Sequence, residues 1–433
     1  MPPVLSRNAL LLLPALWFSA TGHAGPVDQR GRVGVAASAV SDPQEGPLAQ
    51  GFSALQKGRW VDAERDFGTV LTLQPGHPRA LAGLAQALLK LNRTEEAGQR
   101  LEQARKAAPD DPVVMLAAAR YEAFRGRGEA AMALYRQAAV QAPKDETPHR
   151  DMGDLLLNRL KRPAEAVKAY ARAIELAPQD GAARFGLAMA LLATERKADA
   201  LKSLAEAERL TPNDPNPAYM AGRVHASEKR FDAAIAAMGR ALERAPAFVP
   251  ALSDRADLQA EAGQPAAAVA DYERLMKLQP NNPATQLKLG MLYQRTGRLD
   301  EARKAYLGAL QRNDQLAVAY NNLAMMGLRH GKDEAQIEPW ARKAVALGGT
   351  VPHFHDTLGQ VLAAKGDTQG ALAAYREAVK LAPGEPELQF HLAQAYEASG
   401  QRAEAKAAYQ RALAGKGVFE QAGLARQRLQ ALR

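Results

Sequence analysis

Few side chains in this sequence have types and spacings that could carry out chemistry. Among the eight histidines, only His353 and His355 stand close together. Residues two apart on a helix point in different directions, so we do not expect this pair to bind a metal ion. The adjacent acids Asp110 and Asp111 are predicted to lie in a loop, where a carboxylate can cap the start of a helix. Neither pair therefore predicts a catalytic or a metal site.

The sequence also lacks the motifs of the common enzyme classes. It contains no phosphate-binding loop, no GxSxG elbow, no HExxH motif and no cysteine nucleophile. A pattern that recurs about every 34 residues occupies all but the ends of the chain, so no room is left for a separate catalytic domain. We therefore predict that the protein is not an enzyme and uses no cofactor.

A regular spacing of prolines dominates the sequence. Seven prolines recur every 34 or 35 residues, and Asp314, Gly349, Pro383 and Gly417 continue the series. The seven are Pro75, Pro109, Pro143, Pro178, Pro212, Pro246 and Pro280. A fixed period of this length is typical of helical hairpins that bury their apolar faces only against their neighbours. The spacing therefore predicts an all-α solenoid.

Small and aromatic residues recur at fixed distances from these positions. A small residue lies ten residues after each of them, at Ala85, Ala119, Gly153, Ala188, Gly222, Ala256, Gly290, Ala324, Gly359 and Ala393. An aromatic residue lies eight residues before most of them, at Phe67, Tyr135, Tyr170, Tyr272, Tyr306, Tyr375 and Tyr409. A glycine recurs between the two predicted helices, at Gly58, Gly126, Gly263, Gly297, Gly331, Gly366 and Gly400. The small residues let two helices approach closely, the glycine suits a left-handed helix end, and the proline stops the second helix.

This pattern resembles the tetratricopeptide repeat, which closes with A-x3-[FY] and a proline at a period of about 34 residues. The eighth repeat is close to the family pattern at Leu289, Gly290, Tyr293, Gly297, Ala302 and Tyr306. The resemblance implies a right-handed superhelical solenoid of about eleven hairpins over residues 44–419, with a capping helix over 420–433. The fourth repeat departs from the pattern by an extra residue near Leu160 to Pro163. The ninth departs from it at Ile337 and Pro339.

The first 24 residues are predicted to be an export signal. Arg7 precedes a short apolar run from Ala9 to Ala20, and small residues stand at the two positions that signal peptidase inspects before a cut after Ala24. The run is too short to span a bilayer, although retention as an uncleaved anchor remains the alternative. Residues 25–43 are rich in small residues and are predicted to be a flexible linker. We expect a periplasmic or secreted protein without a membrane span in the mature chain.

The charge and the cysteine count narrow the possible partners. The formal charge of +9 is mild for 433 residues and is not gathered with stacking aromatics, so we expect no nucleic-acid partner. A generally solvated basic surface explains this charge, and attraction to anionic envelope polymers is the alternative. The absence of cysteine excludes both disulfides and a lipid anchored on a cysteine.

The resemblance also implies where a partner binds. In tetratricopeptide proteins the first helix of each repeat lines a concave groove with its second, fifth, ninth, twelfth and thirteenth residues. Those positions select Phe185, Met189, Tyr219, Arg223, Leu287, Met291, Arg295, Asn321 and Met325 as candidate partner-binding residues. Methionine and aromatic side chains beside arginine form an adaptable surface for an extended peptide or an amphipathic helix, although methionine on a helix is more often core. The family's carboxylate clamp is not expected, because the ninth positions, Asp154 and Asp257 among them, include no asparagine.

We therefore expect a periplasmic scaffold that binds partner peptides or helices in its groove. Similar exported repeat proteins serve secretion, pili, exopolysaccharide export or outer-membrane biogenesis, and the resemblance implies one of these roles. Two alternatives remain open: a module that binds or guides a polysaccharide, and a regulator of a separate enzyme.

Overall fold

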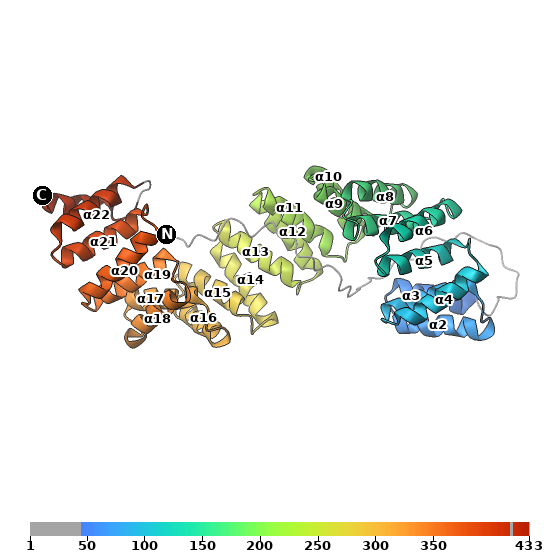
Figure 1. Cartoon of the computed structure of the whole chain (residues 1–433), viewed down its shortest axis with the longest axis horizontal. Helices are drawn as coiled ribbons and strands as arrows, with labels where there is room; N and C mark the ends of the chain where they lie inside the picture. Colours follow the sequence, from blue (N-terminus) through green and yellow to red (C-terminus); the bar gives the residue numbers. More distant parts are fainter. Residues whose placement is uncertain (1–44, 416–418, 433) are drawn as a thin grey trace. The chain divides into compact units, whose positions relative to one another are not determined.

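The computed structural model describes residues 45–415 and 419–432 (Figure 1). Within these ranges the chain forms helices and no strand. The predicted signal peptide and linker lie outside the described residues. The chain divides into two compact units, the first ending at Phe248 and the second beginning at Val249.

The first unit consists of six helical hairpins, each made of an odd-numbered helix and the even-numbered helix that follows. Its helices are α1 (Glu45–Gln56), α2 (Trp60–Leu73), α3 (Pro78–Lys90), α4 (Thr94–Ala107), α5 (Pro112–Phe124), α6 (Gly128–Gln141), α7 (Thr147–Asn158), α8 (Pro163–Leu176), α9 (Gly181–Ala193), α10 (Lys197–Leu210), α11 (Asn216–Ser227) and α12 (Phe231–Arg244).

The second unit consists of five hairpins and a final helix. Its helices are α13 (Val249–Glu261), α14 (Pro265–Leu278), α15 (Pro283–Arg295), α16 (Leu299–Arg312), α17 (Ala317–His330), α18 (Glu334–Leu347), α19 (Pro352–Ala364), α20 (Thr368–Leu381), α21 (Pro386–Ala398), α22 (Arg402–Ala414) and α23 (Ala422–Ala431). Helix α23 packs on α22 and covers the last hairpin. Eleven hairpins and a capping helix confirm the predicted all-α fold class.

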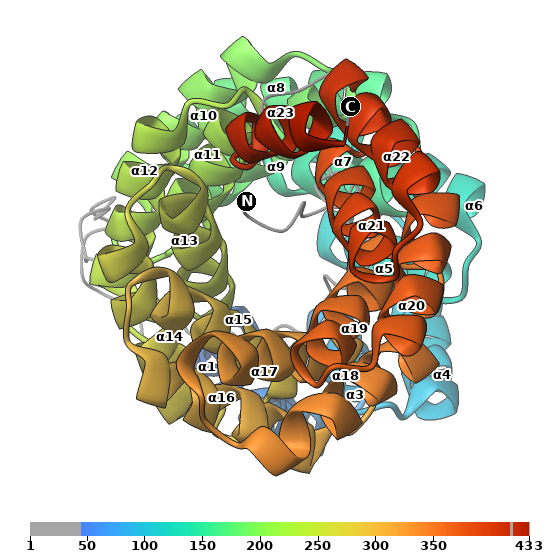
Figure 2. The ribbon, with the colours of Figure 1, turned by 90° about the vertical axis from the view of Figure 1, so that its left-hand side faces the viewer.

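Each unit is built in two layers. Odd-numbered helices of successive hairpins contact one another directly, as in α3–α5 and α7–α9 of the first unit and α17–α19 and α19–α21 of the second. Among the described residues, even-numbered helices of successive hairpins do not pack as closely. In the second unit, Figure 2 shows α13, α15, α17, α19 and α21 on the inner side of the curve. The side of each unit lined by odd-numbered helices is therefore its concave face.

Tyr170 on α8 explains why small and aromatic residues alternate in the repeat. Its side chain is 1% exposed. A Cβ atom at Gly153 on α7 would lie 2.8 Å from the tyrosine ring, and one at Gly186 on α9 would lie 2.4 Å from it. The ring is therefore held between the first helix of its own hairpin and the first helix of the next, and larger side chains at these two positions would push the helices apart.

The seven predicted turn glycines all adopt the left-handed conformation, with φ between 64° and 80°. The four hairpins without a turn glycine place another residue in this conformation, at φ of 55° to 61°: Asn92, Lys161, Glu195 and Lys229. The ninth hairpin has Asp333 at φ 60° in addition to Gly331. The left-handed turn is therefore a property of the hairpin and not of glycine alone, although a Cβ atom makes this conformation less favourable.

One of the two adjacent acids, Asp111, caps a helix as predicted. Asp111 precedes α5 and accepts a hydrogen bond from the Val113 amide at 2.8 Å. Pro112 follows at the first helical position, where its missing amide hydrogen is not needed. Asp110 lies in the preceding turn and is not the capping residue.

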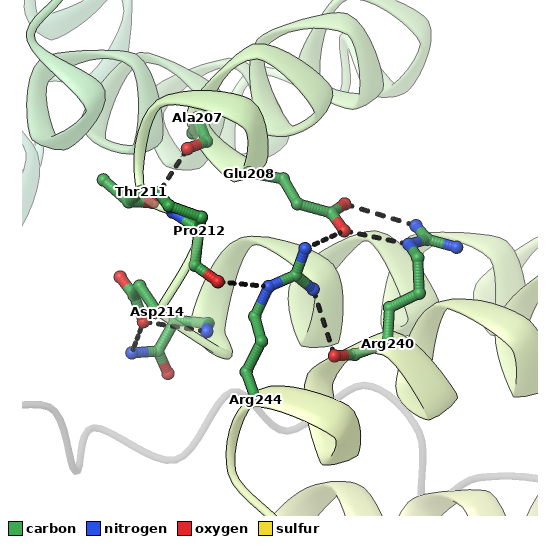
Figure 3. Close-up of polar contacts among 8 residues, drawn as sticks. Ala207, Glu208, Thr211, Pro212, Asp214, Arg240 and Arg244 are labelled. Atoms are coloured by element: carbon green, nitrogen blue, oxygen red, sulfur yellow. Dashed lines mark hydrogen bonds and ion pairs between the residues drawn. The ribbon is translucent and has the colours of Figure 1, made fainter.

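Arginines join successive hairpins on the outer layer of the first unit (Figure 3). Arg244 at the end of α12 donates to the Pro212 carbonyl oxygen at 2.8 Å and lies 2.9 Å from a carboxylate oxygen of Glu208 on α10. Arg240 binds the same carboxylate at 2.9 Å. These contacts connect Pro212, one of the seven recurring prolines, to the next hairpin.

The two irregular hairpins keep the same packing by different means. In the fourth, the extra residue is absorbed in the turn, where Lys161 is left-handed and the Arg162 amide donates to the Leu156 carbonyl oxygen at 2.8 Å. In the ninth, Ile337 replaces the usual alanine and is 9% exposed. A Cβ atom at Gly327 on α17 would lie 2.7 Å from Ile337, so glycine there makes room for the larger side chain.

Candidate partner-binding surface

Ionic and polar contacts connect successive odd-numbered helices along the concave face of the first unit. Arg120 on α5 donates to Asp151 on α7 at 2.7 Å and also to Gln86 on α3. Arg150 on α7 donates to Asp180, the residue that caps α9, at 2.8 Å. These contacts fix the spacing of α3, α5, α7 and α9, and they leave charged groups at the edge of solvent.

Asp154 is the most unusual acid on this face. It accepts a hydrogen bond from the Tyr170 hydroxyl at 2.6 Å, which reaches it from the buried ring below. Asp154 is exposed as a residue, but neighbouring protein atoms remove part of the hydration of its carboxylate. This loss of hydration raises the pKa of Asp154 to about 6; the hydrogen bond from Tyr170 opposes the shift, and the charge of Asp151 adds to it.

The second unit has a matching set of contacts on its own concave face. Lys288 on α15 binds Asp257 on α13, with Nζ 2.7 Å from one carboxylate oxygen and 2.9 Å from the other. Tyr272 on α14 donates its hydroxyl to the same aspartate. Further along, the Asn322 amide donates to the Tyr306 hydroxyl at 3.1 Å.

Four of the nine predicted partner-binding residues lie on the first unit. Phe185 and Met189 on α9 are half-buried. Tyr219 on α11 is 7% exposed, because its ring packs edge-on against Phe248 at 5.2 Å between centroids. The guanidinium of Arg223 lies 6.0 Å from the centre of the Tyr219 ring. Arg223 therefore presents the more accessible surface of this pair.

The other five predicted residues lie on the second unit. Leu287 and Met291 on α15, and Asn321 and Met325 on α17, are half-buried. Arg295 is exposed and donates to the Ala260 carbonyl oxygen at 2.7 Å. The side-chain oxygen of Asn321 is buried without a hydrogen-bond partner among the described residues. The structure thus brings the nine residues together as two groups, one on each unit, and their part in binding stays a prediction.

Position along the repeat places acids on this surface but does not distinguish them from one another. Asp154 and Asp257 both stand at the ninth position, but only their pairing with Tyr170 and Tyr272 distinguishes them from other surface acids. The signal in the sequence is an aspartate 15 or 16 residues before the repeat tyrosine.

The described residues form neither a metal site nor a membrane-spanning helix. No group of three or more histidine, aspartate or glutamate side chains could hold a metal ion there. None of the helices described is long and apolar enough to cross a membrane.

A stack of helical hairpins with a lined concave face defines a class of repeat scaffolds, whose fold is generally not used for catalysis. Tetratricopeptide repeat profiles match residues 54–121, 259–324 and 362–429 in one form, and residues 150–215 and 219–283 in another. The chain belongs to the tetratricopeptide repeat family, whose domains bind protein partners.

Two curated relatives share part of the repeat region. Cellulose synthase operon protein C of Xanthomonas axonopodis pv. citri (strain 306) is 27% identical over 283 residues, which cover 63% of this chain and 17% of the relative. The CTR9 homolog of Arabidopsis thaliana is 28% identical over 190 residues, or 41% of this chain and 17% of the relative. The chain thus spans only a small part of the length of either protein.

Solved structures with the same repeats are similar in parts. The crystal structure of MamA is 26% identical and covers 36% of this chain and 92% of its own, with a TM-score of 0.34. The pilF protein of Pseudomonas aeruginosa is 20% identical and covers 51% of this chain and 97% of its own, with a TM-score of 0.42.

Proposed function

We propose that this protein is a periplasmic or secreted scaffold that binds protein partners on its concave faces and supports an envelope assembly. The observation that carries the proposal is the set of apolar side chains left half-buried on inner helices. These are Phe185, Met189, Leu287, Met291 and Met325. Flexible apolar side chains beside arginines suit an extended peptide or an amphipathic helix.

The envelope role rests on two further observations. The sequence of residues 1–24 is typical of an export signal. One relative carries the name cellulose synthase operon protein C, which favours exopolysaccharide export over secretion, pili or outer-membrane biogenesis. The CTR9 homolog carries an unrelated name, so similarity of the repeats alone does not select the pathway.

Photo-crosslinking in living cells tests partner binding. A photoreactive amino acid is placed at Met189 or at Met291, and in control variants at Lys106 on α4 or Lys380 on α20. Both lysines are strongly exposed on outer helices. We expect the two methionine positions to capture a defined protein that the lysine positions do not. Met325→Glu is expected to abolish capture at Met291, because a carboxylate there opposes apolar contact. Equal capture from all four positions would contradict the proposal.

Cell fractionation with N-terminal sequencing tests the location. We expect the mature chain in the periplasm or the medium, beginning at Gly25. A full-length chain that stays with the inner membrane would support the uncleaved anchor instead.

A polysaccharide-binding or export-guiding module is the second candidate, and the name of the Xanthomonas relative favours it. Arg223 and Arg295 would then bind an acidic glycan, and binding would weaken steeply with added salt because exposed charges are screened. The scaffold proposal expects the reverse: loss of binding in Met291→Glu and little effect of salt. A regulator of a separate enzyme would show the scaffold pattern, with that enzyme as the captured partner.

A further inference from the structure

The aspartates Asp154 and Asp257 share one hydrogen-bonding arrangement. Each lies at the ninth position of its hairpin, on α7 and on α13. Each accepts a hydrogen bond from the buried tyrosine of the same hairpin, Tyr170 or Tyr272. The two tyrosine side chains are 1% and 2% exposed. Asp154–Tyr170 in the first unit and Asp257–Tyr272 in the second are thus the same kind of pair.

In the second unit this pair binds an ammonium group. Nζ of Lys288 lies within 2.9 Å of both carboxylate oxygens of Asp257 and 5.7 Å from the centre of the Tyr272 ring. The lysine therefore contacts a carboxylate and the face of an aromatic ring together, an arrangement that favours a cation. Lys288 comes from α15, the first helix of the next hairpin.

In the first unit the described residues supply no corresponding cation. Gly186 on α9 stands at the position of its hairpin that Lys288 occupies in its own hairpin. A Cβ atom at Gly186 would lie 2.4 Å from the Tyr170 ring, so the close packing of α9 excludes a lysine stem at this position. In the part of the chain that the structure describes, no lysine or arginine forms an ion pair with Asp154.

The charged neighbours of Asp154 are already paired with one another. Arg120 on α5 binds Asp151 on α7, and Arg150 on α7 binds Asp180 before α9. Both arginines therefore bind other acids, and the charge of Arg150 favours the ionised form of Asp154 only from a distance, without an ion pair. Loss of hydration around the carboxylate raises the pKa of Asp154 to about 6, and no directly bound cation offsets this shift. Because Asp154 is exposed as a residue, a group from outside can reach it.

We propose that Asp154 and the Tyr170 hydroxyl form a receptor for a lysine or arginine side chain of the protein partner that binds the concave face of the first unit. The partner's cation takes the place that Lys288 occupies beside Asp257. This inference rests on the proposed function, since it needs a protein partner on that face. It adds the chemistry of the partner: a basic residue is held at α7.

Selection from a random peptide library displayed on phage, against the full chain, tests the receptor. Asp154→Asn removes the charge and keeps the shape of the side chain. Asp199→Asn on α10 is the matched control, because it makes the same charge change at an exposed outer helix. We expect peptides selected on the natural chain and on Asp199→Asn to be enriched in lysine or arginine at one position. We expect no such enrichment on Asp154→Asn.

Affinity measurements sharpen the result. A selected basic peptide should bind Asp154→Asn about tenfold more weakly than the natural chain, the loss typical of one charge-assisted contact. When norleucine replaces the basic residue of the peptide, the two chains should bind it equally, which ties the loss to this pair. Tyr170→Phe should weaken binding less, because it removes only the hydroxyl.

The pKa of Asp154 distinguishes a receptor from a purely structural residue, because only a receptor changes its pKa when the peptide binds. Carboxyl NMR should give a pKa near 6 in the free chain and a lower pKa with the selected peptide bound, because a cation favours the ionised form. Peptides that bind without a basic residue would overturn the receptor and leave the proposed function standing. If no peptide were selected on any of the three chains, both would fall.

Discussion

Nδ1 of His391 on α21 lies 2.7 Å from a carboxylate oxygen of Asp356 on α19, and the two side chains are 13% and 9% exposed. Gln360 donates to the other carboxylate oxygen at 2.8 Å. The pair therefore joins the last two hairpins of the second unit beneath their concave face, where a proton on the imidazole changes the strength of the contact.

The His391–Asp356 pair predicts that the last hairpin is held more firmly at low pH. Burial lowers the pKa of His391, but the hydrogen bond and charge of Asp356, with a smaller contribution from Glu387, outweigh burial and raise it. A raised pKa in the folded chain gives stability that is fully present below about pH 6.5, the ordinary pKa of histidine. This stability is lost as the pH rises through the raised pKa.

Hydrogen exchange of α21 and α22 measures this effect. We expect protection, corrected for intrinsic exchange, to be higher at pH 6 than at pH 9. His391→Gln should lose about 1–3 kcal/mol at pH 6, because it weakens a buried contact to a charged group, and much less at pH 9. His330→Gln on α17 is the control, because that histidine is exposed and lies in an earlier hairpin. An equal loss for His391→Gln at both pH values would contradict a protonated His391.

Two glycine substitutions are predicted to have opposite effects. Gly186→Ala would place a methyl group 2.4 Å from the Tyr170 ring, so we expect a loss of about 1–3 kcal/mol in the free energy of unfolding. Gly68→Ala on α2 meets nothing within 4 Å, and we expect a gain of about 0.5–1 kcal/mol because alanine favours the helix. Urea unfolding followed by circular dichroism measures both. Stabilisation by Gly186→Ala would mean that Tyr170 does not set the spacing of α7 and α9.

The hairpins could be predicted from the sequence because each repeat buries its own pattern. The aromatic Tyr170 packs against small residues of its own hairpin, such as Gly153, and of the next hairpin. These contacts recur in each repeat, so the spacing of the residues along the chain predicts how the helices pack. The left-handed residue Glu195 could not be predicted in this way. Its conformation is set by the two helices that flank it, which outweigh the preference of the residue itself.

The concave faces could be predicted only in part. Tyr219 has the position of a partner-binding residue, but Phe248 packs on its ring from a loop that follows no helical pattern. The absence of a cation at Asp154 depends on Gly186, which stands in another hairpin and which the repeat explains as a small packing residue. Contacts between hairpins therefore decide the chemistry of the surface, whereas contacts within a hairpin decide the fold.

Glycine at the turn between α11 and α12 is predicted to stabilise the chain. Lys229 adopts a φ of 59° there, which a Cβ atom makes unfavourable by about 1–2 kcal/mol. Lys229→Gly relieves this strain, but glycine also gains freedom in the unfolded chain, so we expect a net gain of about 0.5–1 kcal/mol in the free energy of unfolding. Gly126→Ala, at a φ of 79° in an earlier turn, is the reverse substitution and should lose about 1 kcal/mol or more. Urea unfolding of both variants gives the comparison. A loss in Lys229→Gly together with no change in Gly126→Ala would show that backbone strain at the turn does not limit stability.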